Sequence, residues 1–324
     1  MFTTLMDARS VRQSRPRAAA EPSSQPSHLL DLSGRTVLLA TDGSPCAVAA
    51  AFVAYELAQK YHADVHVVSV VDPRSSFIPP PLYVALEISE GALEPQREQE
   101  RAVRAELTKA IGTEIDWPVR VMFGTPAAAI VQEANQLGAA LVVLGLRRHG
   151  RLERAMHDET AINVMRTASC PVLGVIAEMN GLPSRILAAV DFGEGSVLAA
   201  RTARALAGDD ATMVFAYVHP MNGFLLDEGE ARIHDLGVDA GFAELRREFS
   251  NNGVKLDQVV LHKSATDSPA QALLAYAEEM GSDLITAGSV QHSRLDRWMV
   301  GSVSAELVRD GRWSVLIVPP RNRE

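Results

Sequence analysis

A stretch near the C-terminus has the composition of an anion-binding loop. Gly288 ends a short apolar run, twelve residues follow it, and Gly301-Ser302-Val303-Ser304 then opens a stretch with helical periodicity. Glycine allows a backbone to approach a ligand closely, and the free N–H groups at a helix start attract negative charge. With its two hydroxyls this pattern favours a phosphate site, although Ser302 and Ser304 also fit ordinary N-cap residues.

The usual nucleotide and catalytic motifs are missing. The chain has no G-x-x-x-x-G-K-[ST] segment and no G-x-G-x-x-G after an apolar strand, which excludes a P-loop and a dinucleotide fingerprint. Ser44 and Ser196 each follow an apolar run, but neither lies in G-x-S-x-G, and no His and Asp partners can be assigned to them. We therefore expect no catalytic residue, and any turnover of ATP should be slow and incidental.

Metal-ligand residue types occur without metal-site spacing. Four residues of types that can bind metals lie close together between positions 149 and 159. No H-x-x-x-H pair is present, so we expect a solvated loop and no metal site. These four are His149, His157, Asp158 and Glu159. His62, His66 and His219 are expected to be packed or surface histidines. Cys46 and Cys170 are too few for a disulfide framework, so we expect small core residues and a reducing compartment.

The elements that must position the glycine loop occur twice in the chain. TVLLATD at 36–42 and RILAAVD at 185–191 are both short apolar runs that end in Asp, 149 residues apart, and both precede an Ala-rich helical stretch. Three further pairs of apolar runs follow in the same order: 62–73 with 210–220, 140–145 with 283–288, and 169–176 with 313–320.

Each copy is expected to run strand, helix, strand, long crossover, strand, helix, strand, loop and helix, strand. Nearly continuous Val, Leu, Ile and Ala runs are typical of strands buried on both faces of a parallel sheet. Right-handed crossovers place helices on both sides, with the ligand cleft at the carboxyl ends of the strands. We predict an α/β tandem repeat of two doubly wound, open, parallel five-stranded sheets that are Rossmann-like, with crossover helices near 95–111 and 235–249.

The composition pattern divides the chain into two domains and two other segments. These are a disordered leader at 1–34, domain 1 at 35–176, a linker at 177–184 that contains Asn180, Gly181 and Pro183, and domain 2 at 185–320. A bare apolar edge strand invites pairing, so we expect the two fifth strands, Val172 to Ile176 and Val315 to Val318, to join the domains as a pseudo-dimer. Two chains could pair again as a homodimer.

From residue 35 to 320 the chain resembles the universal stress protein family in its tandem form. Family members that bind ATP carry Gly, two residues, Gly, nine residues, then Gly with Ser or Thr. The second copy reads Gly288, two residues, Gln291, nine residues, Gly301 and Ser302, so only the second glycine departs. The resemblance implies the adenine nucleotide alpha hydrolase-like version of the fold, and whether Gln291 abolishes binding stays open.

The resemblance also implies roles for residues of the second copy. Asp191 matches the acidic residue near adenosine, although Asp is also common in turns that follow a strand. Tyr217 falls where the adenine stacks against backbone. The remaining residues implied at the site are those around the phosphates: Gly288, Gln291, Arg297, Gly301, Ser302, Val303 and Ser304.

The first copy departs much further from the family pattern. Its aligned positions read Gly145, two residues, Arg148, nine residues, Asp158 and Glu159. Asp158 would cap the helix amides itself, and a phosphate ~5 Å from a carboxylate costs about 1 to 3 kcal/mol per pair of unit charges. Neighbouring arginines could offset this or pair with the acids instead. We expect a degenerate site, and Asp42 is expected to be a turn residue.

Composition and charge exclude several classes of protein. The formal charge is −9; residues 1–30 hold four Arg against Asp7 and Glu21, a sum of +2, which leaves −11 for the rest. This negative charge on the chain after residue 30 argues against nonspecific binding of nucleic acid or anionic lipid. No apolar run reaches the ~18 to 20 residues of a membrane span, and no secretory signal is evident. We therefore expect a cytoplasmic location.

The resemblance implies a stress-response regulatory protein that binds ATP, with or without Mg²⁺, or a related adenine nucleotide in domain 2. Nucleotide occupancy would then tune conformation or the choice of an unidentified protein partner. A nucleotide-free scaffold is a second reading, and a slow ATPase or self-phosphorylating protein is a third. The stress, the nucleotide and the role of residues 1–30 stay open.

Overall fold

The computed structural model describes residues 30, 32–72, 93–146, 158–219, 228–250, 255–264, 266–289 and 301–320. The strands of the first half are β1 (Thr36–Thr41), β2 (Asp64–Val71), β3 (Val119–Phe123), β4 (Leu141–Gly145) and β5 (Val172–Val175). Those of the second half are β6 (Arg185–Ala189), β7 (Thr212–His219), β8 (Lys255–His262), β9 (Leu284–Gly288) and β10 (Ser314–Val318).

The helices alternate with the strands. The first half contains α1 (Pro45–Tyr61), α3 (Leu93–Ile111), α4 (Pro126–Leu137) and α5 (Asp158–Thr167). The second half contains α6 (Glu194–Leu206), α7 (Glu228–Phe249), α8 (Pro269–Met280) and α9 (Ser302–Asp310). This order confirms the predicted repeat. Helix α7 starts seven residues earlier than predicted, because Gly229 and Gly237 weaken the helical pattern of its first turns.

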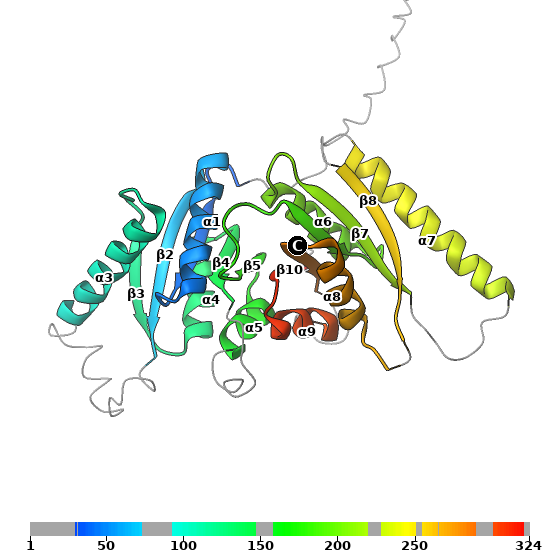
Figure 1. Cartoon of the computed structure of the whole chain (residues 1–324). Coiled ribbons are helices and arrows are strands. Elements are labelled where there is room, and N and C mark those ends of the chain that lie inside the picture. Colours follow the sequence, from blue (N-terminus) through cyan, green and yellow to red (C-terminus); the bar gives the residue numbers. More distant parts are fainter. Residues whose placement is uncertain are drawn as a thin grey trace, which may run out of the picture.

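All ten strands form one sheet, in the order β3-β2-β1-β4-β5-β10-β9-β6-β7-β8 (Figure 1). Each half is a parallel five-stranded sheet, as predicted, and the two fifth strands pair in antiparallel fashion, with Leu173 opposite Leu316. The predicted pairing of these two strands is therefore confirmed. Because the strand direction reverses at this junction, the carboxyl ends of the two halves lie along opposite edges of the ten-stranded sheet.

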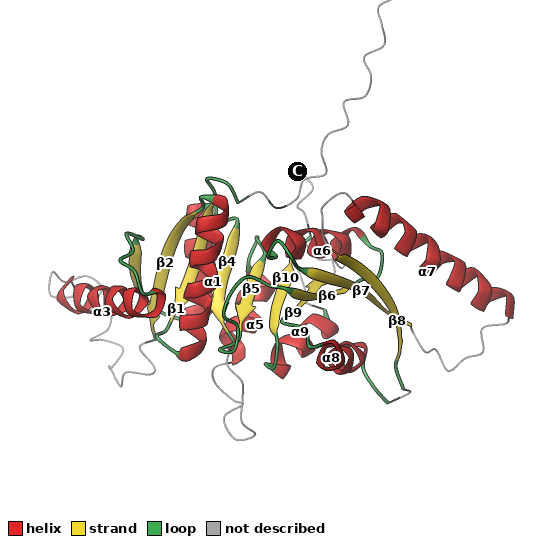
Figure 2. Ribbon diagram, turned by 45° about the horizontal axis from the view of Figure 1, so that its top comes forward, coloured by secondary structure: helices red, strands yellow, loops and turns green. Residues whose placement is uncertain are grey.

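Both faces of the sheet are buried at its inner strands, which explains why these strands are nearly continuous apolar runs, whereas the outer strands β3 and β8 are partly exposed. Alternate residues of β1 contribute to two separate cores, Val37 and Leu39 to one and Leu38 and Ala40 to the other. The first core includes side chains from α1, α3, α6 and α7, and the second includes side chains from α4, α5, α8 and α9. Figure 2 shows helices on either side of the sheet. Each core therefore extends across both halves.

Polar contacts also join the two halves. The backbone N–H of Ile176 donates to Ser314 Oγ at 3.2 Å, next to the β5–β10 pair. At the end of α1, Lys60 Nζ donates to Ala207 O at 2.7 Å and lies 2.9 Å from Asp209 Oδ1, while the Tyr61 hydroxyl donates to Ala205 O. The last turn of α1 is thus fixed against the end of α6.

Glycine at the end of the fourth strand of each half allows the first helix to lie against that strand. A Cβ on Gly288 would lie 2.5 Å from the backbone carbon of Gly195, at the start of α6. A Cβ on Gly145 would lie 2.7 Å from the backbone carbon of Cys46, at the start of α1. No side chain fits at either position, so these glycines are required by packing whether or not a ligand is bound.

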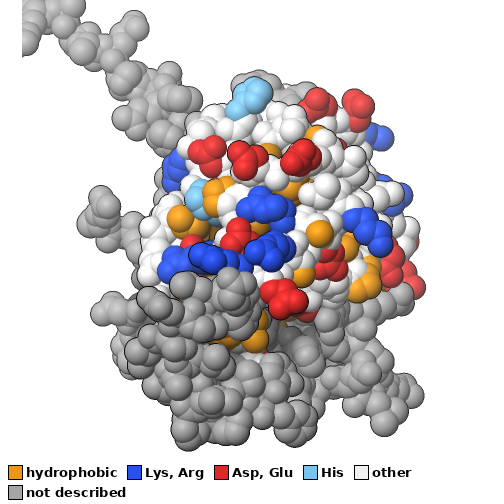
Figure 3. All heavy atoms as spheres, turned by 90° about the vertical axis from the view of Figure 1, so that its left-hand side faces the viewer, with side chains coloured by type: hydrophobic (Ala, Val, Ile, Leu, Met, Phe, Trp, Pro, Cys, Tyr) orange, Lys and Arg blue, Asp and Glu red, His pale blue; other side chains and the backbone are white. Residues whose placement is uncertain are grey.

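The surface of the described residues agrees with the mixed charge of the sequence. Figure 3 views the face at the β3 end of the sheet, where Lys and Arg side chains lie among Asp and Glu side chains. Among the helices that the structure describes, none combines the length and apolarity needed to cross a bilayer.

Replacing Gly288 by Ala should destabilise the protein by about 1 to 3 kcal/mol or more, because the new Cβ overlaps the α6 backbone. Gly237→Ala is the matched control. It lies inside α7, and a Cβ there meets no heavy atom within 4 Å, so the change should stabilise the helix by up to about 1 kcal/mol. Urea denaturation of both variants measures the difference, and equal midpoints would contradict the packing argument.

Candidate functional site

Those predicted site residues of the second half that the structure describes lie along one edge of the sheet. Asp191 follows β6, Tyr217 is near the end of β7, Gly288 ends β9 and Ser302 begins α9. Because β6, β7 and β9 are parallel, their carboxyl ends share this edge. It is the position at which open α/β sheets generally bind ligands.

Asp191 shapes the turn between β6 and α6. Its Oδ1 accepts hydrogen bonds from Gly193 N at 2.9 Å and from Ser196 Oγ at 2.6 Å. Within the described part of the chain, no hydrogen bond reaches its Oδ2. The residue is exposed, and one of its carboxylate oxygens organises the turn. The turn-residue interpretation therefore holds and is compatible with ligand binding.

Phe192 occupies a strained position in this turn. Its φ is 62°, a left-handed conformation that costs a residue with a side chain roughly 1 to 2 kcal/mol. The equivalent residue of the first half is Gly43, with a φ of 74°. The Phe192 ring stacks on Tyr217 at a centroid distance of 5.2 Å and meets the edge of Phe242 at 5.1 Å. These contacts offset the strain and fix an aromatic ring beside Asp191.

Nothing in the sequence pattern pointed to Phe192. The one signal that could have found it is the comparison of the two turns, Asp42-Gly43-Ser44 and Asp191-Phe192-Gly193, where a glycine is replaced by a bulky residue. The space for its ring comes from α7, since a Cβ on Gly241 would lie 2.5 Å from a ring carbon of Phe192.

Tyr217 is half-buried between Phe192 and α7. Its hydroxyl lies 3.1 Å from His234 Nε2. Burial raises the pKa of the Tyr217 phenol above its ordinary value, and the nearby Asp191 carboxylate raises it further. The phenol is therefore neutral at physiological pH and can both donate and accept a hydrogen bond.

Among the residues that the structure describes, no side chain caps the start of α9. Gly301 is its N-cap and has no side chain to accept from the first turn, while its carbonyl accepts from Ala305 N at 3.0 Å. The first turn contains no acidic residue. Such a helix start carries a partial positive charge and N–H groups that favour an anion. The predicted helix start at Ser302 is confirmed.

The residues after Gly301 differ in exposure. Ser302 is exposed and Val303 is partly buried, whereas Ser304 is buried and its Oγ lies 3.5 Å from Gly288 O. Ser304 thus ties the start of α9 to the end of β9. Of the two predicted hydroxyl donors, Ser302 is the one directed to the surface region of the helix start.

A run of contacts links Asp191 to the start of α9. Asp191 Oδ1 bonds Ser196 Oγ, the Ser196 amide packs against Gly288, and the Gly288 carbonyl lies against Ser304. The carboxylate and the uncapped amides are therefore parts of one small region. Two of the predicted site residues, Gln291 and Arg297, lie outside the described residues.

The first half has a different turn chemistry at the equivalent edge. Asp42 Oδ1 accepts from Ser44 N at 3.0 Å, and Ser44 Oγ caps α1 by accepting from Ala47 N at 3.3 Å. The turn interpretation of Asp42 fits this geometry. Helix α5 begins at Asp158, but the side chains of Asp158 and Glu159 lie outside the described parts of the structure, as does Arg148. The predicted loss of this site stays a prediction.

The cysteines are buried, and one of the histidines lies in a cluster of metal-ligand residue types. Cys46 and Cys170 are buried, as expected for small core residues, and burial raises the pKa of the Cys170 thiol to about 11. His149 and His157 lie outside the described residues. His219, expected to be an ordinary packed or surface residue, lies instead beside His234 and Asp235.

Curated relatives match about half of the chain. "Universal stress protein MJ0531" of Methanocaldococcus jannaschii is 29% identical over 141 residues, which cover 44% of this chain and 81% of that protein. The "Universal stress protein in QAH/OAS sulfhydrylase 3'region" of Thermus aquaticus is 34% identical over 139 residues, which cover 43% of this chain and 96% of that protein.

Solved structures share the fold over most of the chain. A universal stress protein from Archaeoglobus fulgidus DSM 4304 superposes with a TM-score of 0.59 at 19% identity, covering 91% of this chain and all of that one. Protein PA1789 from Pseudomonas aeruginosa PAO1, described as functionally unknown, gives a TM-score of 0.57 at 16% identity, covering 88% and 92%.

The family model agrees with the internal repeat of strands and helices. It matches the chain twice, at residues 34–175 and again at 183–319, so that each half of the ten-stranded sheet corresponds to one match. The chain therefore belongs to the universal stress protein family, in its tandem form.

Proposed function

We propose that the second domain binds an adenine nucleotide, ATP or a close relative, and that the protein acts as a nucleotide-dependent regulator in the cell's response to stress. The observation that carries this proposal is the start of α9, which has no side-chain cap among the described residues and is linked through Gly288 and Ser196 to the exposed Asp191 carboxylate. The phosphates of a nucleotide are anionic and would bind at the start of α9. Its ribose carries hydroxyl groups, which would donate to the Asp191 carboxylate.

Different residues of the second domain would bind the phosphates and the ribose of the nucleotide. The amides of Ser302 and Val303 and the hydroxyl of Ser302 would donate to phosphate oxygens, assisted by the partial positive charge of the helix start. Asp191 would accept from a ribose hydroxyl through Oδ2. Gly288 and Ser304 would contribute indirectly, since both make packing contacts within the protein that hold the end of β9 against α6 and the start of α9.

Tyr217 and Phe192 would form the apolar side of the site. Their stacked rings stand next to Asp191, and stacked or offset aromatic contacts stabilise flat apolar groups such as a purine. When Mg²⁺ accompanies ATP it would neutralise part of the phosphate charge. We assign no catalytic residue, and the proposed location of the protein is the cytoplasm.

The first domain would then be structural. It supplies half of both hydrophobic cores and the β5 partner of β10, which give it a role without any ligand. Nucleotide binding to domain 2 would act on an unidentified protein partner or on a second copy of the chain.

Gly301→Asp should abolish nucleotide binding, because the new carboxylate caps the α9 amides and repels phosphate by about 1 to 3 kcal/mol for each pair of unit charges. Gly181→Asp adds the same charge in the segment between the domains, where a Cβ meets no heavy atom within 4 Å, and should leave binding unchanged. Calorimetric titration of the purified protein with ATP and Mg²⁺ measures both. Equal affinities for the two variants would mean that the phosphates bind elsewhere.

Asp191→Asn should weaken nucleotide binding by about tenfold, since one hydrogen bond to a charged acceptor contributes about 1.5 kcal/mol or more. Asp42→Asn changes the equivalent residue of domain 1 and should have no effect on affinity. The reverse result would place the nucleotide in domain 1.

Two further outcomes distinguish the competing readings. Wild-type protein with ATP at 100 times its dissociation constant should gain ~2.7 kcal/mol of stability, and no gain would favour the scaffold. If the wild-type protein releases or transfers labelled phosphate from ATP and the Ser302→Ala variant does not, the result would favour a slow ATPase or a self-phosphorylating protein.

A further inference from the structure

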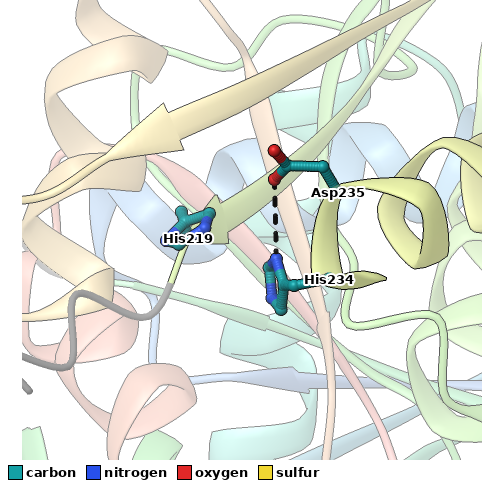
Figure 4. A group of neighbouring side chains, drawn as sticks. All are labelled: His219, His234 and Asp235. Atoms are coloured by element: carbon teal, nitrogen blue, oxygen red, sulfur yellow. Dashed lines mark ion pairs between the residues drawn. The ribbon is translucent and has the colours of Figure 1, made fainter. Parts of the chain in front are cut away.

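A cluster of metal-ligand side chains lies beside the proposed nucleotide site but is not part of it. His219 is the last residue of β7, and His234 and Asp235 are neighbours on α7. One ligand atom from each of the three side chains can be chosen so that all lie within 4.8 Å of one another. Figure 4 shows the two elements bringing these side chains together, with His219 on β7 to one side of the His234–Asp235 pair on α7.

The hydrogen bonding of His234 leaves one ring nitrogen available. Nε2 lies 3.1 Å from the Tyr217 hydroxyl, whereas Nδ1 is buried and has no hydrogen-bond partner in the described part of the structure. Asp235 Oδ1, at 3.8 Å from Nδ1, is beyond hydrogen-bond distance. A buried polar atom without a partner costs roughly 1 to 3 kcal/mol and therefore requires an explanation, such as a bound ion.

Tyr217 can select the ring form that binds a cation. If Nε2–H donates to the neutral phenol oxygen, Nδ1 carries the lone pair, and that lone pair faces the carboxylate side of the cluster. A hydrogen bond from the far nitrogen of a ligating histidine is the usual way in which proteins orient such a ring.

His219 brings a second imidazole close to His234 and Asp235. Its ring meets the edge of the His234 ring at a centroid distance of 4.6 Å and stacks on His262 at 5.5 Å. His262 lies opposite His219 in the β7–β8 register and is exposed at the rim. Two imidazoles and one carboxylate are a donor set that suits zinc and its neighbours, whereas magnesium and calcium prefer oxygen ligands throughout.

We propose that His219, His234 and Asp235 bind a divalent transition metal ion of the zinc type, with Tyr217 as the residue that orients His234. Three protein ligands leave at least one coordination position for water or for a group from a partner. The site does not depend on nucleotide binding, although Tyr217 borders both regions.

The test is metal titration of the full-length protein after treatment with a chelator. Calorimetry with Zn²⁺ and visible absorption with Co²⁺ should both show one site per chain. His219→Ala, His234→Ala and Asp235→Asn should each weaken that binding by at least about tenfold. Asp239→Asn, an exposed residue one turn further along α7, should bind as the wild type does.

The orienting role of Tyr217 needs a separate variant. Tyr217→Phe removes only the hydroxyl and should weaken Zn²⁺ binding by about 10-fold or more with unchanged stoichiometry. Tyr276→Phe, on α8, is the control and should have no effect. If the Tyr217→Phe variant binds Zn²⁺ with wild-type affinity, Tyr217 does not orient His234 for metal binding.

The outcomes that overturn the site do not depend on whether a histidine variant folds. Asp235 is exposed, so Asp235→Asn preserves the fold, and its thermal unfolding checks this. Absence of Zn²⁺ binding by the wild type, or binding by Asp235→Asn and both histidine variants at wild-type affinity, would show that these residues hold no metal.

Discussion

The arrangement of both halves depends on the close approach of one helix to one strand end. Helix α6 lies so near β9 that only glycine fits at position 288, and α1 lies as near β4 at Gly145. In the second half this approach brings Ser196 beside Asp191 and places the Gly288 carbonyl within reach of Ser304. The turn after β6 and the start of α9 are consequently linked through the end of β9.

The same framework carries different chemistry in its two copies. In the first, Ser44 caps α1, and a glycine takes the left-handed position of the turn. In the second, a glycine precedes α6 and Phe192 takes the left-handed position, with its ring against Tyr217. Backbone strain is therefore found where the chain packs an aromatic ring against Tyr217.

The periodicity of apolar residues was sufficient to predict the order of elements, the parallel sheets and the pairing of the fifth strands, because burial on both faces leaves a clear pattern. The start of α9 could be predicted because glycine and serine have strong preferences at helix starts. The role of Gly288 in packing, the ring of Phe192 and the meeting of His219 with His234 could not, since each depends on which distant segments touch. A spacing rule such as H-x-x-x-H applies within one helix and does not detect ligands from a strand and a helix.

The reversal of strand direction at the β5–β10 junction has a consequence for how the chain can be used. Along the strand direction, the carboxyl edge of the second half lies a whole strand length, roughly 17 Å for five residues, from the carboxyl edge of the first. The two carboxyl edges therefore open on opposite sides of the molecule, and small groups placed at both edges would not touch.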